Sequence, residues 1–151
     1  MPASIARERP DSADAAALIG ELERYVSPMY PHDAEHGLSP AQLVRTGVAF
    51  FIARVDGVPA GCGGVMLDGA GAGEVVRMYV RPRYRGRGLG RQMLEYLESY
   101  ARGHGARALR LKTGIYQLEA LNLYERHGYR EVRAFGPYRD HPLNRYYEKR
   151  L

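Results

Sequence analysis

The sequence predicts a single α/β domain in which helices cover a mixed β-sheet. Its 151 residues match the usual length of one domain, so we treat 1–151 as a unit. Short β-prone runs precede and follow a core in which strand and helix patterns alternate. The chain is 45% hydrophobic, which is enough for a core without disulfides. The single cysteine, Cys62, rules out a disulfide scaffold or a cysteine-rich zinc site.

The first half of the chain carries clear start and stop signals. Asp11 is the expected N-cap of one helix, and Ser39 followed by Pro40 is the expected start of another. Asp56-Gly57 between two apolar runs indicates a β-hairpin. We therefore expect strands at 4–9, 49–55 and 58–67 and helices at 13–25 and 40–45.

The second half begins with a strand and a glycine-rich loop. Leu89, Met93 and Leu97 repeat every four residues, which predicts a helix that faces the core and runs to about Arg102. The remaining pattern predicts strands at 74–80, 106–113, 129–135 and 144–149 and a further helix at 117–126.

Charge is distributed unevenly along the chain. The sequence has 22 basic and 17 acidic residues, a net charge of +5, with −3 in residues 1–60 and +8 in residues 61–151. A basic balance indicates an anionic partner without naming it, and a charge run is often only a solvated face. Six arginines with no acidic residue between them fall within fifteen residues: Arg77, Arg81, Arg83, Arg85, Arg87 and Arg91.

The stretch from Val75 to Arg91 combines a strand, a glycine loop and a helix start. Unpaired N–H groups in the first turn of a helix attract anions, and glycines let a phosphate approach them closely. The stretch therefore fits a phosphate cradle. Its glycines are spaced Gly86-x-Gly88-x-Gly90, which is neither a Rossmann fingerprint nor a P-loop. A plain glycine turn or an arginine-rich nucleic-acid-binding segment would share this composition.

Two motifs together resemble those of the GNAT superfamily of N-acyltransferases. Arg85-x-x-Gly88-x-Gly90 is similar to the family's acyl-CoA pyrophosphate loop, and ALNLYERHGY at 120–129 is similar to its A-x-x-L-Y-x-x-x-G-[FY] stretch. The resemblance implies an α+β GNAT fold, with a mixed, mostly antiparallel sheet of about six or seven strands flanked by about four helices. It also implies an acetyl-CoA-dependent N-acetyltransferase that needs no metal.

For the co-substrate, the resemblance assigns the strand before the loop to the pantetheine arm and the loop to the pyrophosphate. The strand residues are Met78, Tyr79 and Val80. The loop residues are Arg85, Gly86, Arg87, Gly88, Leu89, Gly90 and Arg91. The family often has Asn seven residues before its tyrosine, and Gln117, which keeps an amide, stands there.

For catalysis, the resemblance implies direct attack of an amine on the thioester in a ternary complex. Tyr124 matches the family tyrosine that protonates the leaving thiolate, and Glu74 stands where some members place a general base. Lys112, at the other family position for a base, suits the role only if its pKa falls strongly. His32 and His36 are alternative bases. Cys62 lacks a partner base in any recognisable motif, which disfavours a covalent route.

The acceptor site is expected between the segments 25–39 and 135–144, which shape that pocket in the family. The candidate substrate-binding residues are Tyr30, His32, His36 and Tyr138. The acidic bias of residues 1–60 would suit a cationic amine. His32-x-x-x-His36 lacks a third ligand, so we expect no metal site.

We expect a cytoplasmic protein, since the sequence shows no secretory signal and no membrane-spanning run. A small-molecule amine is the expected partner, with neither nucleic acid nor membrane. The alternatives are a basic nucleic-acid-binding module and a non-catalytic acyl-CoA sensor. The acceptor's identity, the acyl chain and a homodimeric state are left open.

Overall fold

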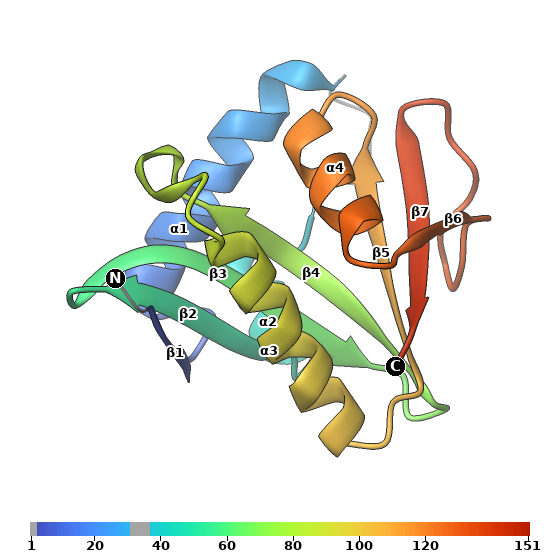
Figure 1. The fold of residues 1–151 in the computed structure, drawn as a ribbon, viewed down its shortest axis with the longest axis horizontal. Helices are drawn as coiled ribbons and strands as arrows, with labels where there is room; N and C mark the ends of the chain where they lie inside the picture. Colours follow the sequence, from blue (N-terminus) through green and yellow to red (C-terminus); the bar gives the residue numbers. More distant parts are fainter. Residues whose placement is uncertain (1–2, 31–36) are drawn as a thin grey trace.

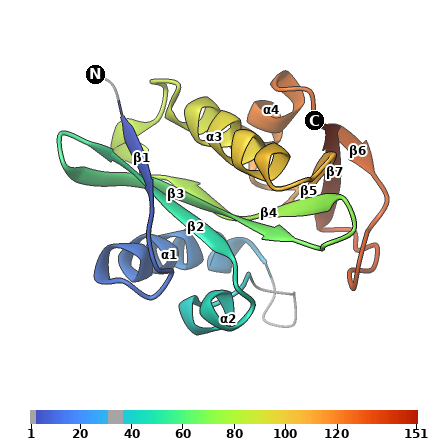
Figure 2. The same cartoon turned by 90° about the horizontal axis from the view of Figure 1, so that it is seen from below.

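The computed structural model describes residues 3–30 and 37–151, which form a seven-stranded sheet with four α-helices. The strand order is β1-β2-β3-β4-β5-β7-β6, and every neighbouring pair is antiparallel except the parallel pair β4–β5. Helices α1 and α2 cover one face of the sheet, and α3 and α4 cover the other (Figures 1 and 2). The mixed, mostly antiparallel sheet expected from the sequence is confirmed.

The expected elements are all present, with some different ends. The strands are β1 (Ser4–Arg7), β2 (Ala49–Val55), β3 (Val58–Leu67), β4 (Ala72–Val80), β5 (Ala108–Gly114), β6 (Arg130–Val132) and β7 (Asn144–Arg150). The helices are α1 (Ala13–Val26), α2 (Pro40–Arg45), α3 (Leu89–Gly103) and α4 (Leu118–Arg126), with 3₁₀ turns at Ser27–Met29 and Pro82–Tyr84. Strand β4 begins two residues earlier than expected, and β6 is much shorter.

The start of α1 corrects one expectation. Ser12, not Asp11, is the N-cap, because its backbone is extended and its hydroxyl accepts a hydrogen bond from the Ala15 N–H at 3.1 Å. Asp11 instead forms an ion pair with Arg9. At α2, Ser39 caps the helix as expected and forms a reciprocal capping box with Gln42.

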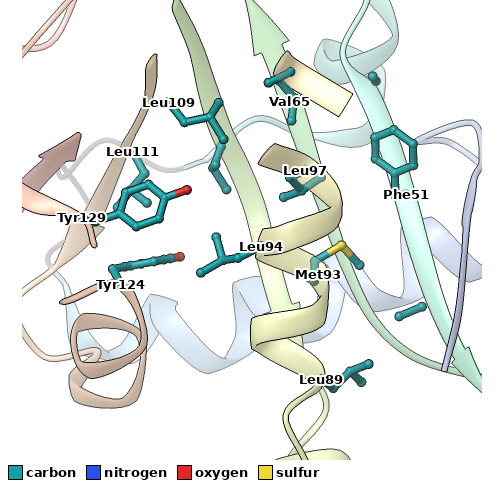
Figure 3. Packing of buried hydrophobic residues seen from close by; sticks show 14 of the residues in the cluster. Phe51, Val65, Leu89, Met93, Leu94, Leu97, Leu109, Leu111, Tyr124 and Tyr129 are labelled. Atoms are coloured by element: carbon teal, nitrogen blue, oxygen red, sulfur yellow. The ribbon is translucent and has the colours of Figure 1, made fainter. Parts of the chain in front are cut away.

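The sheet separates two apolar clusters. Phe51, Val65 and Leu109 share one cluster with the buried stripe of α3, and Tyr124 of α4 belongs to it (Figure 3). Leu18 of α1 and Phe50 of β2 belong to the other. Since alternate residues of a strand face opposite sides, β2, β3 and β4 contribute to both clusters.

A bulge at Arg77 interrupts this alternation in β4. The β3–β4 register gains one residue between the pairs Gly64–Val76 and Cys62–Tyr79, and Arg77 lies in the left-handed region with φ of 51°. The extra residue exchanges the two faces of the strand. Met78 and Val80 therefore pack against the α3 cluster, although Val76 packs on the α1 side.

Strands β4 and β5 pair over a short distance and then diverge (Figure 1). Their parallel pairing joins Ala72–Val75 to Ala108–Leu111. Beyond it, β4 continues to Val80 and β5 continues to Gly114. The backbone edge of β4 that follows Val75 is therefore available to a ligand, in the way that a sheet edge accepts an extended peptide.

Helix α3 is tied to the C-terminal strand by a buried carboxylate. Glu98 accepts a hydrogen bond from the Tyr129 hydroxyl at 2.9 Å and from the Lys149 ammonium at 3.1 Å. Its side chain is 8% exposed, whereas the side chain of Glu95 on the same helix is 64% exposed. Burial and the neighbouring carboxylate raise the pKa of Tyr129, so this hydroxyl stays a donor.

Replacing Glu98 should destabilise the fold far more than replacing Glu95. Glu98→Ala leaves Lys149 and the Tyr129 hydroxyl without this acceptor, which should lower the free energy of unfolding by about 3 kcal/mol. Glu95→Ala removes a solvent-exposed pair with Arg91 and should change it by less than about 0.5 kcal/mol. Urea denaturation of both variants measures the difference, and equal midpoints would contradict this role for Glu98.

Candidate active site

A cleft of about 1040 Å³ opens where β4 and β5 diverge, between the start of α3 and one face of α4. It is lined by every residue that the sequence assigned to the co-substrate: Met78, Tyr79, Val80, Arg85, Gly86, Arg87, Gly88, Leu89, Gly90, Arg91 and Gln117. The candidate acid Tyr124 also lines it. These predicted residues, which are up to 46 positions apart in sequence, therefore lie around one cavity.

The start of α3 forms one wall of the cleft. Its N-cap is Gly88 in a left-handed conformation with φ of 78°, no side chain caps the helix, and its first turn has no acidic residue. The free first-turn N–H groups and the partial positive charge at this end favour an anion. Gly90 allows a close approach of α4, since a Cβ there would lie 3.0 Å from the Leu123 side chain.

Arg85 spans the cleft beside this helix start. Its Nε donates to the Val80 carbonyl oxygen at 2.9 Å, and Nη1 lies 3.6 Å from the Glu119 carboxylate on α4. The guanidinium also lies over the rings of Tyr25 and Tyr79. These contacts hold Arg85 against both walls of the cavity.

Helix α4 places Tyr124 on the inner wall. The Tyr124 ring is buried and packs against Tyr129 and Tyr147, with ring centroids 5.8 Å and 6.4 Å apart. In Figure 3 the hydroxyl groups of Tyr124 and Tyr129 both point toward α3. Burial raises the pKa of Tyr124, so its phenol keeps its proton at any ordinary pH.

Glu74 lies outside the cleft, beside the last β4–β5 pair. It shares the α1 face of the sheet with Val76, because Val75 between them packs on the α3 side. The Tyr138 hydroxyl donates to its Oε2 at 2.6 Å. The Lys112 ammonium lies 4.5 Å from the centre of the Tyr138 ring. Burial raises the pKa of Glu74, and the Tyr138 hydrogen bond and the Lys112 charge oppose that rise.

The structure places the other candidates differently. Tyr30 lies beside the cleft, with its hydroxyl 3.4 Å from Gln117 Oε1 and close enough to accept from the Tyr116 N–H. The Gln117 oxygen also accepts from the Gly114 N–H at 3.0 Å. Gln117 is thereby fixed at the end of β5. His32 and His36 lie outside the described residues.

The arginine run divides into two groups. Arg85, Arg87 and Arg91 line the cleft, but Arg77 and Arg81 point to α1, where they form ion pairs with Glu23 at 2.6 Å and Glu21 at 2.7 Å. The Arg77 side chain is 7% exposed. Two of the six arginines therefore belong to the packing of α1 on the sheet and not to the cleft.

The acidic residues of the first half are engaged in the same way. Glu8 and Asp14 both form ion pairs with Arg54, and Asp11 forms one with Arg9. With Glu21 and Glu23 also paired to arginines, five carboxylates of this half are engaged by four arginines. In the described part of the chain, the acidic bias does not create a negatively charged pocket.

Cys62 is buried in β3, and its thiol donates to the Arg77 carbonyl oxygen at 3.3 Å. Burial raises the pKa of this thiol to about 12, which suits a packing role and not a nucleophile.

Within residues 3–30 and 37–151, no three His, Cys, Asp or Glu side chains come together as a metal site would require. No helix in these segments combines the length and apolarity of a membrane span.

Several lining residues were not anticipated from the sequence. On α4, Ala120, Leu123, Tyr124 and His127 follow the i, i+3, i+4, i+7 spacing of one helix face, and all four line the cleft. That spacing, counted from Tyr124, could have identified them. Leu22 and Tyr25 of α1 also line the cleft, and no local pattern links them to it.

Comparisons with known proteins agree with this geometry. A family model described as acetyltransferase (GNAT) family matches residues 17–129. An IAA acetyltransferase of Azospirillum brasilense is 41% identical over 149 residues, covering 98% of this chain and 97% of that protein.

Solved structures show the same fold. A Klebsiella pneumoniae protein described as a candidate acyl-CoA N-acyltransferase is 35% identical, with a TM-score of 0.85 and coverage of 99% and 97% of the two chains. An N-acetyltransferase of Thermoplasma acidophilum in complex with coenzyme A has a TM-score of 0.76 at 16% identity, with both chains fully covered. The expected family is confirmed, and this chain belongs to the acetyltransferase (GNAT) family.

Proposed function

We propose that this protein transfers an acetyl group from acetyl-CoA to the primary amine of a small molecule or peptide, by direct attack in a ternary complex. One observation carries the proposal. The uncapped start of α3, the edge of β4 beyond its pairing with β5, and the Tyr124 phenol all meet in one cleft. The bound co-substrate supplies an acetyl thioester. A structural relative that holds coenzyme A supports this donor.

The cleft residues fit such a co-substrate. First-turn N–H groups of α3 and the arginines Arg87 and Arg91 would hold the pyrophosphate. The backbone of Met78–Val80 would pair with the amides of the pantetheine arm, and one of its N–H groups would stabilise negative charge on the carbonyl oxygen.

The two candidate catalytic groups lie on opposite faces of the sheet. Tyr124 lies on the α4 side and would donate its proton to the leaving thiolate, whose pKa as a free thiol is about 8.5. Glu74 lies on the α1 side and would accept a proton from the acceptor amine, directly or through water. The acceptor would then approach from the α1 face, and the thiol would leave on the α4 side.

Because five of the six described acidic residues in 1–60 are paired with arginines, they do not favour a cationic acceptor. Acetyl-CoA-dependent thiol release should be assayed with a panel of acceptors. The panel contains amino acids, polyamines, neutral amines, a basic peptide and IAA, the compound in the name of the 41% identical relative. Turnover with at least one amine supports the function. Thiol release with none of the amines, combined with salt-dependent binding of nucleic acid and no thermal shift by acetyl-CoA, would favour the nucleic-acid alternative.

Gly88→Ala should weaken acetyl-CoA binding about tenfold, because a side chain in the left-handed region costs roughly 1–2 kcal/mol and favours turning the α3 N–H groups away. Gly105→Ala is the matched control, since Gly105 has φ of 88° with open space around it. Titration calorimetry should show unchanged affinity for the control. Equal affinities for both variants would contradict the pyrophosphate assignment.

Tyr124→Phe should lower kcat about 100-fold while acetyl-CoA affinity is retained, because it removes the proton donor and keeps the buried ring. Steady-state thiol release and a thermal shift with acetyl-CoA measure the two quantities. Tyr96→Phe, on the exposed side of α3, should leave both unchanged. A Tyr124→Phe enzyme with full kcat would exclude Tyr124 as the acid.

A further inference from the structure

Tyr138 donates a hydrogen bond to the candidate base Glu74. It lies in the segment between β6 and β7, 64 residues from Glu74 in sequence, and its hydroxyl donates to Glu74 Oε2 at 2.6 Å. A hydroxyl that donates to a carboxylate stabilises the ionised form and fixes the orientation of the group.

The Tyr138 ring is itself held in place from three sides. Its centroid lies 5.4 Å from that of Phe135 and 6.1 Å from that of Tyr146, and the Lys112 ammonium lies 4.5 Å from it. The Tyr146 hydroxyl donates to the Arg139 carbonyl oxygen at 2.7 Å, which anchors the residue that follows Tyr138. The phenol is therefore placed by packing.

The charged groups around Glu74 come from several elements. On β5, the charge of Lys112 lowers the pKa of Glu74. Arg110, which pairs with Glu74 in register, forms an ion pair with Glu148 at 2.7 Å. On β3, the opposite residue is Met66, which does not titrate. Among the described residues, Tyr138 thus hydrogen-bonds the carboxylate, and the positive charge of Lys112 favours its ionised form.

We infer that Tyr138 is a positioning residue of the reaction, whose hydroxyl keeps the Glu74 carboxylate ionised and oriented to accept the proton of the acceptor amine. The inference rests on the proposed function, in which Glu74 is the base. Tyr138 keeps its own proton throughout, and the proton lost by the amine passes to Glu74. Tyr138 then acts through Glu74, a role distinct from the direct substrate contact expected from the sequence.

The inference predicts a pH effect with a definite sign. Burial raises the pKa of Glu74, and the Tyr138 hydrogen bond lowers it. Removing the hydroxyl in Tyr138→Phe should therefore raise the pKa further, so the acidic limb of kcat/KM should move up by about one pH unit. Activity lost near neutral pH should return at higher pH, which lost packing or lost substrate contact would not produce.

The test uses the acceptor that gives the fastest thiol release in the panel. Profiles of kcat/KM against pH are compared for the parent, Tyr138→Phe and Tyr96→Phe. Tyr96→Phe is the control, because it removes a hydroxyl from a partly exposed tyrosine of α3, away from the aromatic group that holds Tyr138. A shifted limb in Tyr138→Phe alone supports the inference. A lower rate with an unmoved limb in Tyr138→Phe would overturn it.

A second measurement does not depend on turnover. Titration of ¹³C-labelled glutamate side chains by NMR reports the Glu74 midpoint, with the Glu74 signal assigned by its loss in Glu74→Gln. An unchanged midpoint in Tyr138→Phe overturns the inference. The midpoint could also rise in Tyr138→Phe while Glu74→Gln keeps the full rate and the acidic limb of the parent. That combination would show that Glu74 is not the base. It would overturn the positioning role together with that part of the proposed function.

Discussion

The short pairing of β4 with β5 is the constraint on which the candidate site depends. After Val75 the strands separate, and the bulge at Arg77 turns Met78 and Val80 to the side of α3. A non-glycine residue with a positive φ is costly, so it must be held by its surroundings. The Glu23 carboxylate holds the Arg77 side chain, and the Cys62 thiol donates to its carbonyl oxygen. The packing of α1 thus helps to maintain the opening that forms the cleft.

The arginine run has two tasks that its sequence does not separate. A strand followed by a loop and a helix places successive arginines in different directions, so Arg77 and Arg81 reach α1, while Arg87 and Arg91 flank the start of α3. The net charge of +5 therefore overstates the charge available to an anionic ligand. A nucleic-acid surface would need its cations exposed together, and two of these six are already committed to buried or half-buried ion pairs.

Local signals account for the parts of the site that the sequence could predict. The glycine loop, the α3 stripe and the tyrosine of α4 each lie within one or two adjacent elements, where spacing fixes geometry. The contacts of Glu74 and Glu98 could not be predicted in this way. Their partners Tyr138 and Tyr129 come from segments 64 and 31 residues away, and the pairings depend on sheet order and register. The acidic bias of the first half was misleading for the same reason, since four of its carboxylates pair with arginines 40 to 60 residues away.

Burial acts on both proposed catalytic groups, but it suits them differently. It raises the pKa of Tyr124, which keeps the phenol protonated until a thiolate forms but also makes it a weaker acid toward that thiolate. It raises the pKa of Glu74 as well, which works against a base that must be ionised before the amine arrives. Tyr138 and Lys112 oppose the rise in the Glu74 pKa, whereas burial is the cause of the rise in the Tyr124 pKa. The environment of Tyr124 thus favours the protonated state that a donor needs, whereas the base role of Glu74 depends on Tyr138 and Lys112 to limit a rise that opposes ionisation.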